Sequence, residues 1–220
     1  MKNIKAIIFD AYGTLFDVNS AAKKCKDKIG DKWESFANYW RTTQLEYTWL
    51  RSLMKRHKDF WQITEDSLDK SMKLYNIDIL MKEELLNLYK VLSPFPEVKE
   101  TLNKLKDTNY KLAILSNGTP DLLNQLVRNS DLENIFDDIF SIEEVRTFKP
   151  DSKVYDIPVK KYKIQKNEIV FLSANTWDVS GAGNYGYNSV WVNRSNNIFD
   201  NLDYKPNHKI KSLVQLLEII

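Results

Sequence analysis

Residues 4–15 read IKAIIFDAYGTL, and the prediction of the fold starts from this segment. Residues 4–9 form a short apolar run typical of a buried β-strand, and the run stops at Asp10. Gly13-Thr14 follow within a turn, where glycine lets the backbone bend sharply. Taken alone, Asp10 indicates either a carboxylate nucleophile at a strand end or an Asx-turn that closes the strand.

Short apolar runs recur along the chain and alternate with helical patterns. The further runs lie at residues 112–115, 139–141, 169–172 and 189–192. The helical patterns lie at residues 98–106, 120–129, 153–162 and 213–219. Strands that alternate with amphipathic helices form parallel sheets covered on both faces. We therefore predict an α/β fold whose core is a Rossmann-like, doubly wound parallel sheet.

Small polar or acidic residues stand where several of the predicted strands end. They are Asp10, Ser116, Asn117, Ser173, Asn175 and Asn193. In an open parallel sheet, ligands bind outside the carboxyl ends of the strands. The sequence therefore predicts that a functional site lies at this edge of the sheet.

Residues 18–92 interrupt the alternation, because they contain no convincing strand and are rich in aromatic and charged helical patterns. The proline-rich segment 93–96 then restores the alternation. We predict that residues 1–17 and 93–220 form the core, and that residues 18–92 form an inserted α-helical cap over the functional edge.

The composition is that of an ordinary globular protein and limits the possible partners. The chain has 220 residues, 43% of them hydrophobic, and a net charge of +2, which does not favour a nucleic-acid partner. Cys25 is the only cysteine, which excludes an internal disulfide. The N-terminal apolar run is too short for a signal peptide or membrane span, so we expect a cytoplasmic protein without a membrane partner. Both histidines, His57 and His208, lie among charged residues and are expected to be solvated.

Segments at these strand ends resemble, in order, the motifs of the haloacid dehalogenase superfamily. The segment that begins at Phe9-Asp10 is similar to the first motif, and Ser116-Asn117-Gly118 is similar to the second. Lys149-Pro150 is similar to the third, and the segment from Ser173 to Asp178 falls where the fourth belongs. The resemblance extends over essentially the whole chain and includes a helical cap after the first motif.

Within this superfamily the sequence departs from the phosphatase branch. In phosphatases a second Asp protonates the leaving group, and Tyr12 occupies that position here. Losing a general acid typically costs a factor of about 10² to 10⁴. Phosphatases also carry paired acidic residues in the fourth motif for Mg²⁺, whereas this chain has Ser173 and Asn175, with Asp178 as the only carboxylate. We therefore expect no metal and no cofactor.

The chain instead resembles the type II L-2-haloacid dehalogenases. It matches their first motif from Asp10 to Asp17 and their cap motif at Tyr39-Trp40-Arg41. Further matches are Lys149, Pro150, Tyr155, Ser173, Asn175 and Asp178. Ala174 replaces a Ser of the family pattern. Pro158 lies inside a helical pattern, where a proline is expected to kink the helix.

This resemblance implies a reaction and a role for each matched residue. Asp10 is the nucleophile that displaces halide from C2 of a short L-2-haloalkanoic acid, and the ester is then hydrolysed to the 2-hydroxy acid with inversion. Lys149 is the counter-charge of Asp10, Thr14 orients it, and Arg41 and Asn117 receive the halide. Ser116 and backbone N–H groups hold the substrate carboxylate.

Asp178 is implied to activate the hydrolytic water, with hydrogen bonds from Ser173, Asn175 and Tyr155. The implied substrate-binding residues are Ala11, Tyr12, Arg41, Leu45, Phe60, Ser116, Asn117 and Trp177. The implied partners are a small halogenated carboxylic acid, water and halide, and a homodimer is possible.

Other functions stay open from the sequence. One alternative is a phosphatase-type hydrolase of a small phosphomonoester, and a second is a non-catalytic binding protein with the same fold. A third is a related hydrolase that uses Asp10 on another activated carbon centre.

Overall fold

A parallel sheet forms the centre of the computed structural model, which describes residue 1 and residues 3–220. Its six strands are β1 (Ala6–Phe9), β2 (Lys111–Ser116), β3 (Asp138–Ser141), β4 (Ile169–Ser173), β5 (Asn188–Val192) and β6 (His208–Ile210). Their order in the sheet is β3-β2-β1-β4-β5-β6, and every neighbouring pair is parallel. The order reverses beside β1, which is the switch point of a doubly wound fold.

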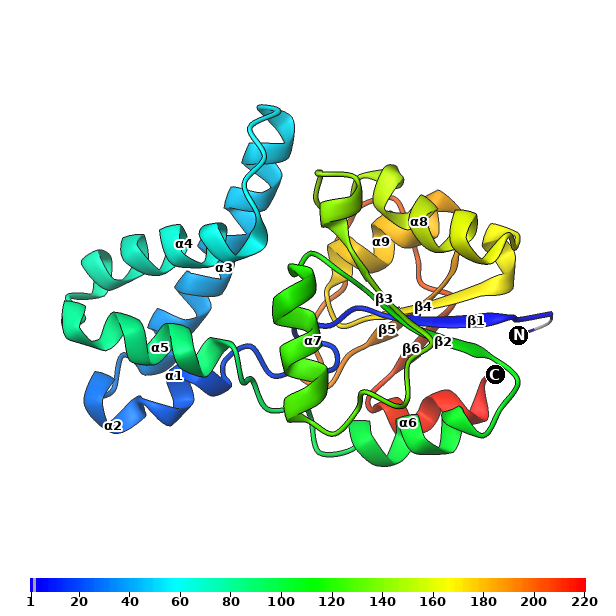
Figure 1. Cartoon of the computed structure of the whole chain (residues 1–220), viewed down its shortest axis with the longest axis horizontal. Coiled ribbons are helices and arrows are strands. Elements are labelled where there is room, and N and C mark those ends of the chain that lie inside the picture. Colours follow the sequence, from blue (N-terminus) through cyan, green and yellow to red (C-terminus); the bar gives the residue numbers. More distant parts are fainter. Residues whose placement is uncertain (2) are drawn as a thin grey trace.

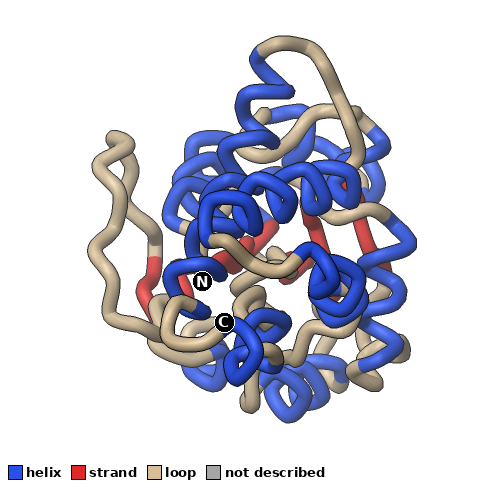
Figure 2. Tube along the Cα trace, turned by 90° about the vertical axis from the view of Figure 1, so that its left-hand side faces the viewer, coloured by secondary structure: helices blue, strands red, loops and turns tan. Residues whose placement is uncertain are grey.

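Helices cover both faces of this sheet. They are α6 (Val98–Lys106), α7 (Pro120–Asn129), α8 (Ser152–Tyr162), α9 (Thr176–Tyr185) and the 3₁₀ helices η2 (Ile142–Glu144), η3 (Lys166–Glu168) and η4 (Leu213–Glu218). In Figure 1, α8 and α9 lie on one side of the sheet and α6 and the C-terminal segment lie on the other. Figure 2 shows most of the strands between helices, and a strand at the left of the view that borders loops. The predicted fold class is confirmed.

The central strand is buried along its whole length, as its apolar sequence predicts. All residues of β1 are inaccessible to solvent, because β2 and β4 flank it and helices cover the sheet. Phe9 is in register with Ile114 of β2 and Leu172 of β4, so these three strands end at the same edge. Asp10 and the polar residues after β2 and β4 are thereby brought together.

The segment between β1 and α6 contains helices joined by loops and, in its described residues, contributes no strand to the sheet. Its elements are α1 (Ser20–Lys24), α2 (Lys26–Ile29), α3 (Trp33–Leu53), α4 (Phe60–Tyr75), η1 (Ile79–Met81) and α5 (Lys82–Tyr89). They form a group beside the sheet in Figure 1. Phe16 and Pro94 form a bridge, so the connections into and out of this helical cap run side by side. The domain bounds at 17/18 and 92/93 stay a prediction.

The structure differs from the sequence-based expectations in several elements. The patterns at α6 and α7 are confirmed at both bounds, but the C-terminal pattern forms the 3₁₀ helix η4 instead of an α-helix. Strand β6 and helix α9 were not predicted. Strand β6 is a three-residue edge strand with two polar members, and α9 contains Gly181 and Gly183, so neither shows the usual periodicity.

Helix α8 runs from Ser152 to Tyr162 with Pro158 buried inside it, and the kink expected at this proline stays a prediction. One expectation about a single residue needs correction. His57 is not solvated: its side chain is 12% exposed, and Nε2 lies 2.9 Å from Oε2 of Glu143. This contact links the loop between α3 and α4 to η2. Within the described residues, no helix is long and apolar enough to cross a membrane.

The close packing around Gly181 leads to a prediction about the free energy of unfolding. A Cβ at this position would lie 2.5 Å from Cβ of Pro150 and 2.7 Å from Oη of Tyr155. We expect Gly181→Ala to destabilise the protein by about 1–3 kcal/mol in urea unfolding, although alanine favours helices. Asn184→Ala, at an exposed position of the same helix, is the control and should be neutral or stabilising. Equal stability of the two variants would contradict this packing argument.

Candidate active site

Asp10 lies directly after β1 and its two carboxylate oxygens have different partners. Oδ2 accepts hydrogen bonds from Oγ1 of Thr14 at 3.0 Å, Oγ of Ser173 at 3.2 Å and Nδ2 of Asn175 at 2.8 Å. Oδ1 contacts Nζ of Lys149 at 3.2 Å. The side chain is 7% exposed. One oxygen is therefore anchored by three donors, while the other faces only a cation.

Lys149 is a buried ammonium shared by two carboxylates. Its side chain is 1% exposed, and Nζ lies 3.2 Å from Oδ1 of Asp10 and 3.0 Å from Oδ2 of Asp178. Nζ also lies 4.8 Å from the centre of the Phe171 ring. Buried charges persist only when they are paired and hydrogen-bonded. Lys149 thus holds together the end of β1 and the first turn of α9.

Asp178 is fully buried and differs electrostatically from a surface carboxylate. Its Oδ1 accepts a hydrogen bond of 2.7 Å from Oη of Tyr155, which is itself fully buried. Burial raises the pKa of Asp178 to about 6, and the charge of Asp10 adds to this rise, whereas Lys149 opposes it. Burial raises the pKa of Tyr155 well above its ordinary value, so this phenol remains a neutral donor. A carboxylate with a pKa near 6 is a suitable general base at neutral pH.

Ala174 interacts with the site through its backbone. Its N–H donates to Oγ1 of Thr14 at 2.8 Å, and the Thr14 hydroxyl in turn donates to Asp10. The amide of Asn175 also donates to the backbone oxygen of Tyr12 at 3.2 Å. The contact at position 174 does not use the side chain, so the replacement of Ser by Ala preserves it.

Ser116 is the last residue of β2 and Asn117 follows it, so both border the same edge. Ser116 is fully buried, and its Oγ accepts a hydrogen bond of 3.2 Å from the N–H of Gly118. Oδ1 of Asn117 accepts a hydrogen bond of 3.0 Å from the N–H of Lys149. The oxygen of the Asn117 amide is therefore occupied by a hydrogen bond from the loop that carries Lys149. The N–H side of that amide is therefore the part that can donate to a ligand.

Tyr12 forms the contact between core and cap at this site. Its ring is tilted against Phe60 with centres 5.1 Å apart, and it stacks on Tyr89 at 5.8 Å. Burial raises the pKa of both phenols, and Asp10 adds to this rise, whereas the charge of Arg41 lowers it. Arg41 and Asp10 thus act on the same pair of rings, one from the cap and one from the core.

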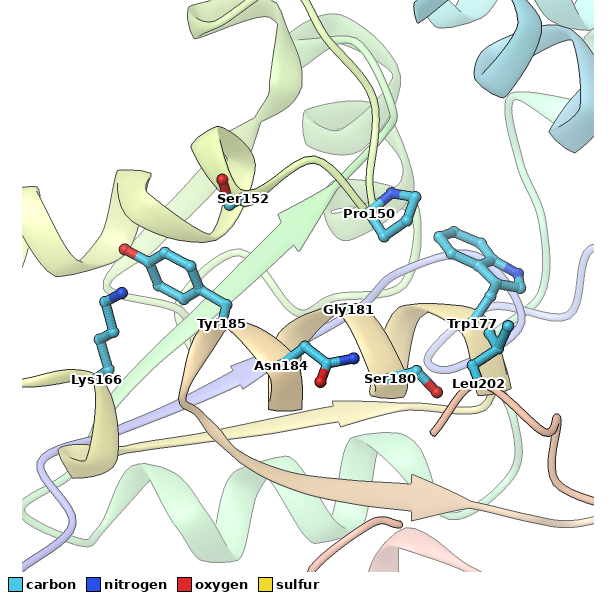
Figure 3. A pocket seen from close by; sticks show the side chains of 9 residues that line it. All are labelled: Pro150, Ser152, Lys166, Trp177, Ser180, Gly181, Asn184, Tyr185 and Leu202. Atoms are coloured by element: carbon cyan, nitrogen blue, oxygen red, sulfur yellow. The ribbon is translucent and has the colours of Figure 1, made fainter. Parts of the chain in front are cut away.

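Three further predicted substrate-binding residues lie on the segment after β1, on α3 and on α9, and their binding roles stay predictions. Ala11 is fully buried after Asp10, and Leu45 is partly exposed on α3, one turn from Arg41. Trp177 of α9 packs edge-to-face against Trp49 of α3, with ring centres 5.4 Å apart. It also lines a cavity of about 480 Å³ with Pro150, and the two side chains stand together in Figure 3.

Some residues near the site were not predicted from the sequence. Gln44 accepts a hydrogen bond of 2.8 Å from Nη1 of Arg41, and Tyr89 stacks on Tyr12. The spacing of three residues between Arg41 and Gln44 on one helix is a signal that could have indicated the first contact. In residue 1 and residues 3–220, no group of three or more His, Cys, Asp or Glu side chains could hold a metal ion.

A family model for haloacid dehalogenase-like hydrolases matches residues 4–186. The chain therefore belongs to this family, and the resemblance inferred from the motifs is confirmed. It is 40% identical to an (S)-2-haloacid dehalogenase of Pseudomonas fluorescens, over 98% of this chain and 96% of the relative. It is 37% identical to (S)-2-haloacid dehalogenase 4A of Burkholderia cepacia, over 99% of this chain and 95% of the relative.

The fold also matches solved structures of this kind. The L-2-haloacid dehalogenase from Xanthobacter autotrophicus with chloropropionic acid covalently bound is 32% identical, with a TM-score of 0.91. The match covers 98% of each chain.

The raised pKa of Asp178 predicts a specific dependence of stability on pH. The folded protein holds this proton up to about pH 6, whereas the ordinary pKa is 3.8, so folding binds a proton in between. The contribution of Asp178 to stability should therefore fall as pH rises from about 4 to 6 and then level off. The measurement is the difference in urea unfolding free energy between parent and Asp178→Asn at each pH. A difference that rises over this range would contradict the assignment.

Proposed function

We propose that this protein hydrolyses the carbon–halogen bond of short L-2-haloalkanoic acids to 2-hydroxy acids with inversion, without a metal ion. The supporting observation is the asymmetric environment of Asp10, whose Oδ2 is anchored by three donors while Oδ1 faces Lys149. The names of its relatives, and the chloropropionic acid covalently bound in the Xanthobacter structure, support the same substrate class.

In the first step, Oδ1 of Asp10 attacks C2 of the substrate from the side opposite the halogen. The C2–halogen bond breaks, the halide leaves with its electron pair, and an ester forms with C2 inverted. Nζ of Lys149 lies 3.2 Å from the attacking oxygen, and unit charges about 4 Å apart attract by roughly 4 kcal/mol at an effective dielectric near 20, so the ion pair fixes this oxygen in place. The nucleophile is thus activated by burial and orientation.

In the second step, water attacks the carboxyl carbon of Asp10 and Asp178 accepts its proton. Oδ2 is the carbonyl oxygen of the ester, so negative charge develops on the atom that Thr14, Ser173 and Asn175 already contact. Donors placed in advance at a developing oxyanion are a large source of rate acceleration. Collapse of the intermediate breaks the bond between the carboxyl carbon and Oδ1, and the departing alkoxide takes the proton from Asp178 and leaves as the 2-hydroxy acid. Asp10, which now carries an oxygen from water, loses its carboxyl proton to solvent and is a carboxylate again.

The leaving halide and the substrate carboxylate need separate donors in this scheme. Arg41 from the cap and the amide of Asn117 receive the halide, which would be strongly disfavoured in a dry pocket without donors. Ser116 and the backbone N–H groups after Asp10 hold the carboxylate. The alkyl group lies among Tyr12, Leu45, Phe60 and Trp177.

The proposal disfavours a metal-dependent phosphatase for a physical reason. The position between Asp10 and Asp178 is filled by the ammonium of Lys149, at 3.2 and 3.0 Å. A divalent cation bound there would have to displace a buried charge that is already paired. The cap bounds, the cytoplasmic location and the homodimer remain predictions from the sequence.

Replacement of the nucleophile is the direct test. We expect Asp10→Asn to lower chloride release from L-2-chloropropionate by roughly 10³-fold or more, because the amide cannot attack carbon. Circular dichroism should show an unchanged fold, and D-2-chloropropionate serves as the substrate control. Chloride release by the variant at the parental rate would exclude attack by this carboxylate.

Metal dependence separates this reaction from its alternatives. We expect EDTA to leave chloride release unchanged, since Lys149 supplies the cation at the site. Added Mg²⁺ should produce no phosphate release from small phosphomonoesters. Phosphate release that requires Mg²⁺ would identify a phosphatase, and a folded protein that releases neither ion would support the binding-protein alternative.

A further inference from the structure

A cluster of buried polar side chains lies inside the helical cap, and the proposed reaction steps do not use it. Gln44 of α3, Thr64 of α4 and Tyr89, the last residue of α5, are at most 3% exposed. Their only charged neighbour in this hydrogen-bonded cluster is Arg41, which is partly exposed. Burying such polar groups costs free energy unless each one is hydrogen-bonded, so few arrangements of their hydrogen bonds are possible.

The hydrogen bonds of the cluster fix the orientation of the Gln44 amide. The Thr64 hydroxyl donates to the backbone oxygen of Phe60 at 2.7 Å, so its oxygen is left to accept. Nε2 of Gln44 donates to that oxygen at 2.7 Å and to Oη of Tyr89 at 3.0 Å. The contact with Thr64 directs Oε1 of Gln44 toward Arg41, whose Nη1 donates to it at 2.8 Å, and Oη of Tyr89 lies 3.3 Å from the same oxygen.

A neutral acceptor is chemically suited to this position. Arginine side chains lose rotamer entropy when they are held in one conformation, so an acceptor that is already fixed lowers the cost of placing the charge. A carboxylate would also hold Arg41, but the ion pair would cancel the charge that an incoming anion needs. An amide holds the guanidinium and leaves its positive charge available.

The cluster also connects Arg41 to the core. The indole Nε1 of Trp40 donates to the backbone oxygen of Thr64 at 3.1 Å and joins α3 to α4. Tyr89 stacks on Tyr12, which lies two residues after Asp10. This stacking connects the cluster that holds Arg41 to the chain segment that carries Asp10.

We propose that Gln44, oriented by Thr64 and Tyr89, is a positioning residue that aims the Arg41 guanidinium at the anion formed in the site. This inference rests on the proposed function, in which Arg41 receives the halide. It assigns no contact between Gln44 and the substrate.

The test combines Gln44→Met, Gln44→Glu and Arg41→Met with kinetics on L-2-chloropropionate. Small misplacements of a group at a reacting centre can cost up to about 100-fold, so we expect Gln44→Met to lower kcat/KM by roughly 10- to 100-fold. Gln44→Glu should be at least as impaired, because it neutralises Arg41. In the Arg41→Met background, Gln44→Met should have no further effect, since the group it positions is gone.

Two further variants separate positioning from folding. Thr43→Val is the matched control, because Thr43 is a buried neighbour on α3 whose hydroxyl has no hydrogen-bond partner. It should keep the parental kcat and KM. Thr64→Val retains Gln44 but removes the acceptor that orients it, and it should lower kcat/KM in the same direction. An unchanged kcat/KM in Gln44→Met, or an equal loss with and without Arg41, would overturn the inference.

Failure of the proposed function would be recognised separately. If the parent protein releases no halide from any 2-haloacid, that function is wrong, and binding of bromide measured by calorimetry becomes the readout for Gln44. Weaker bromide binding in Gln44→Met than in Thr43→Val would support the positioning role. Equal binding in the two variants, or none in the parent, would overturn it.

Discussion

One buried ammonium between two buried carboxylates constrains the rest of this structure. Lys149 contacts Asp10, 139 positions earlier in the chain, and Asp178, 29 positions later. Taking each of these ions out of water costs several kcal/mol, so the cluster is tolerable only when its remaining oxygens are hydrogen-bonded. The three ions are paired only when three segments meet, namely the end of β1, the loop before α8 and the first turn of α9. The parallel register of β1 with β4 makes that meeting possible.

The same cluster of buried ions also gives the two oxygens of Asp10 different surroundings. The three uncharged donors to the buried carboxylate act on Oδ2 of Asp10, and the ammonium of Lys149 donates to Oδ1. The core therefore holds a carboxylate with one anchored oxygen and one oxygen that faces Lys149, and in the proposed scheme the cap contributes the cation Arg41. Nucleophile and anion receptor come from different parts of the chain, so catalysis in the proposed scheme requires the two parts to pack together at Tyr12.

Much of the fold was predictable because apolar periodicity is a local property. The strands around β1 and the helices α6 and α7 follow directly from their patterns. Helix α9 was missed because packing selects its small residues: Gly181 lies where any side chain would collide with Pro150 and Tyr155. Strand β6 is short and polar, and only its pairing with β5 makes it a strand. The burial of His57 likewise depends on Glu143, a residue distant in sequence.

The amino-acid sequence alone determined that a carboxylate ends the first buried strand, that polar residues stand at the ends of the next strands, and that Tyr12 stands where a second carboxylate would be. Only the tertiary structure decided which oxygen of Asp10 is anchored, which side of the Asn117 amide is free, and that Gln44 holds Arg41. Residue type specifies which groups can donate or accept. The choice of partner depends on distances between segments far apart in the chain, and these exist only after folding.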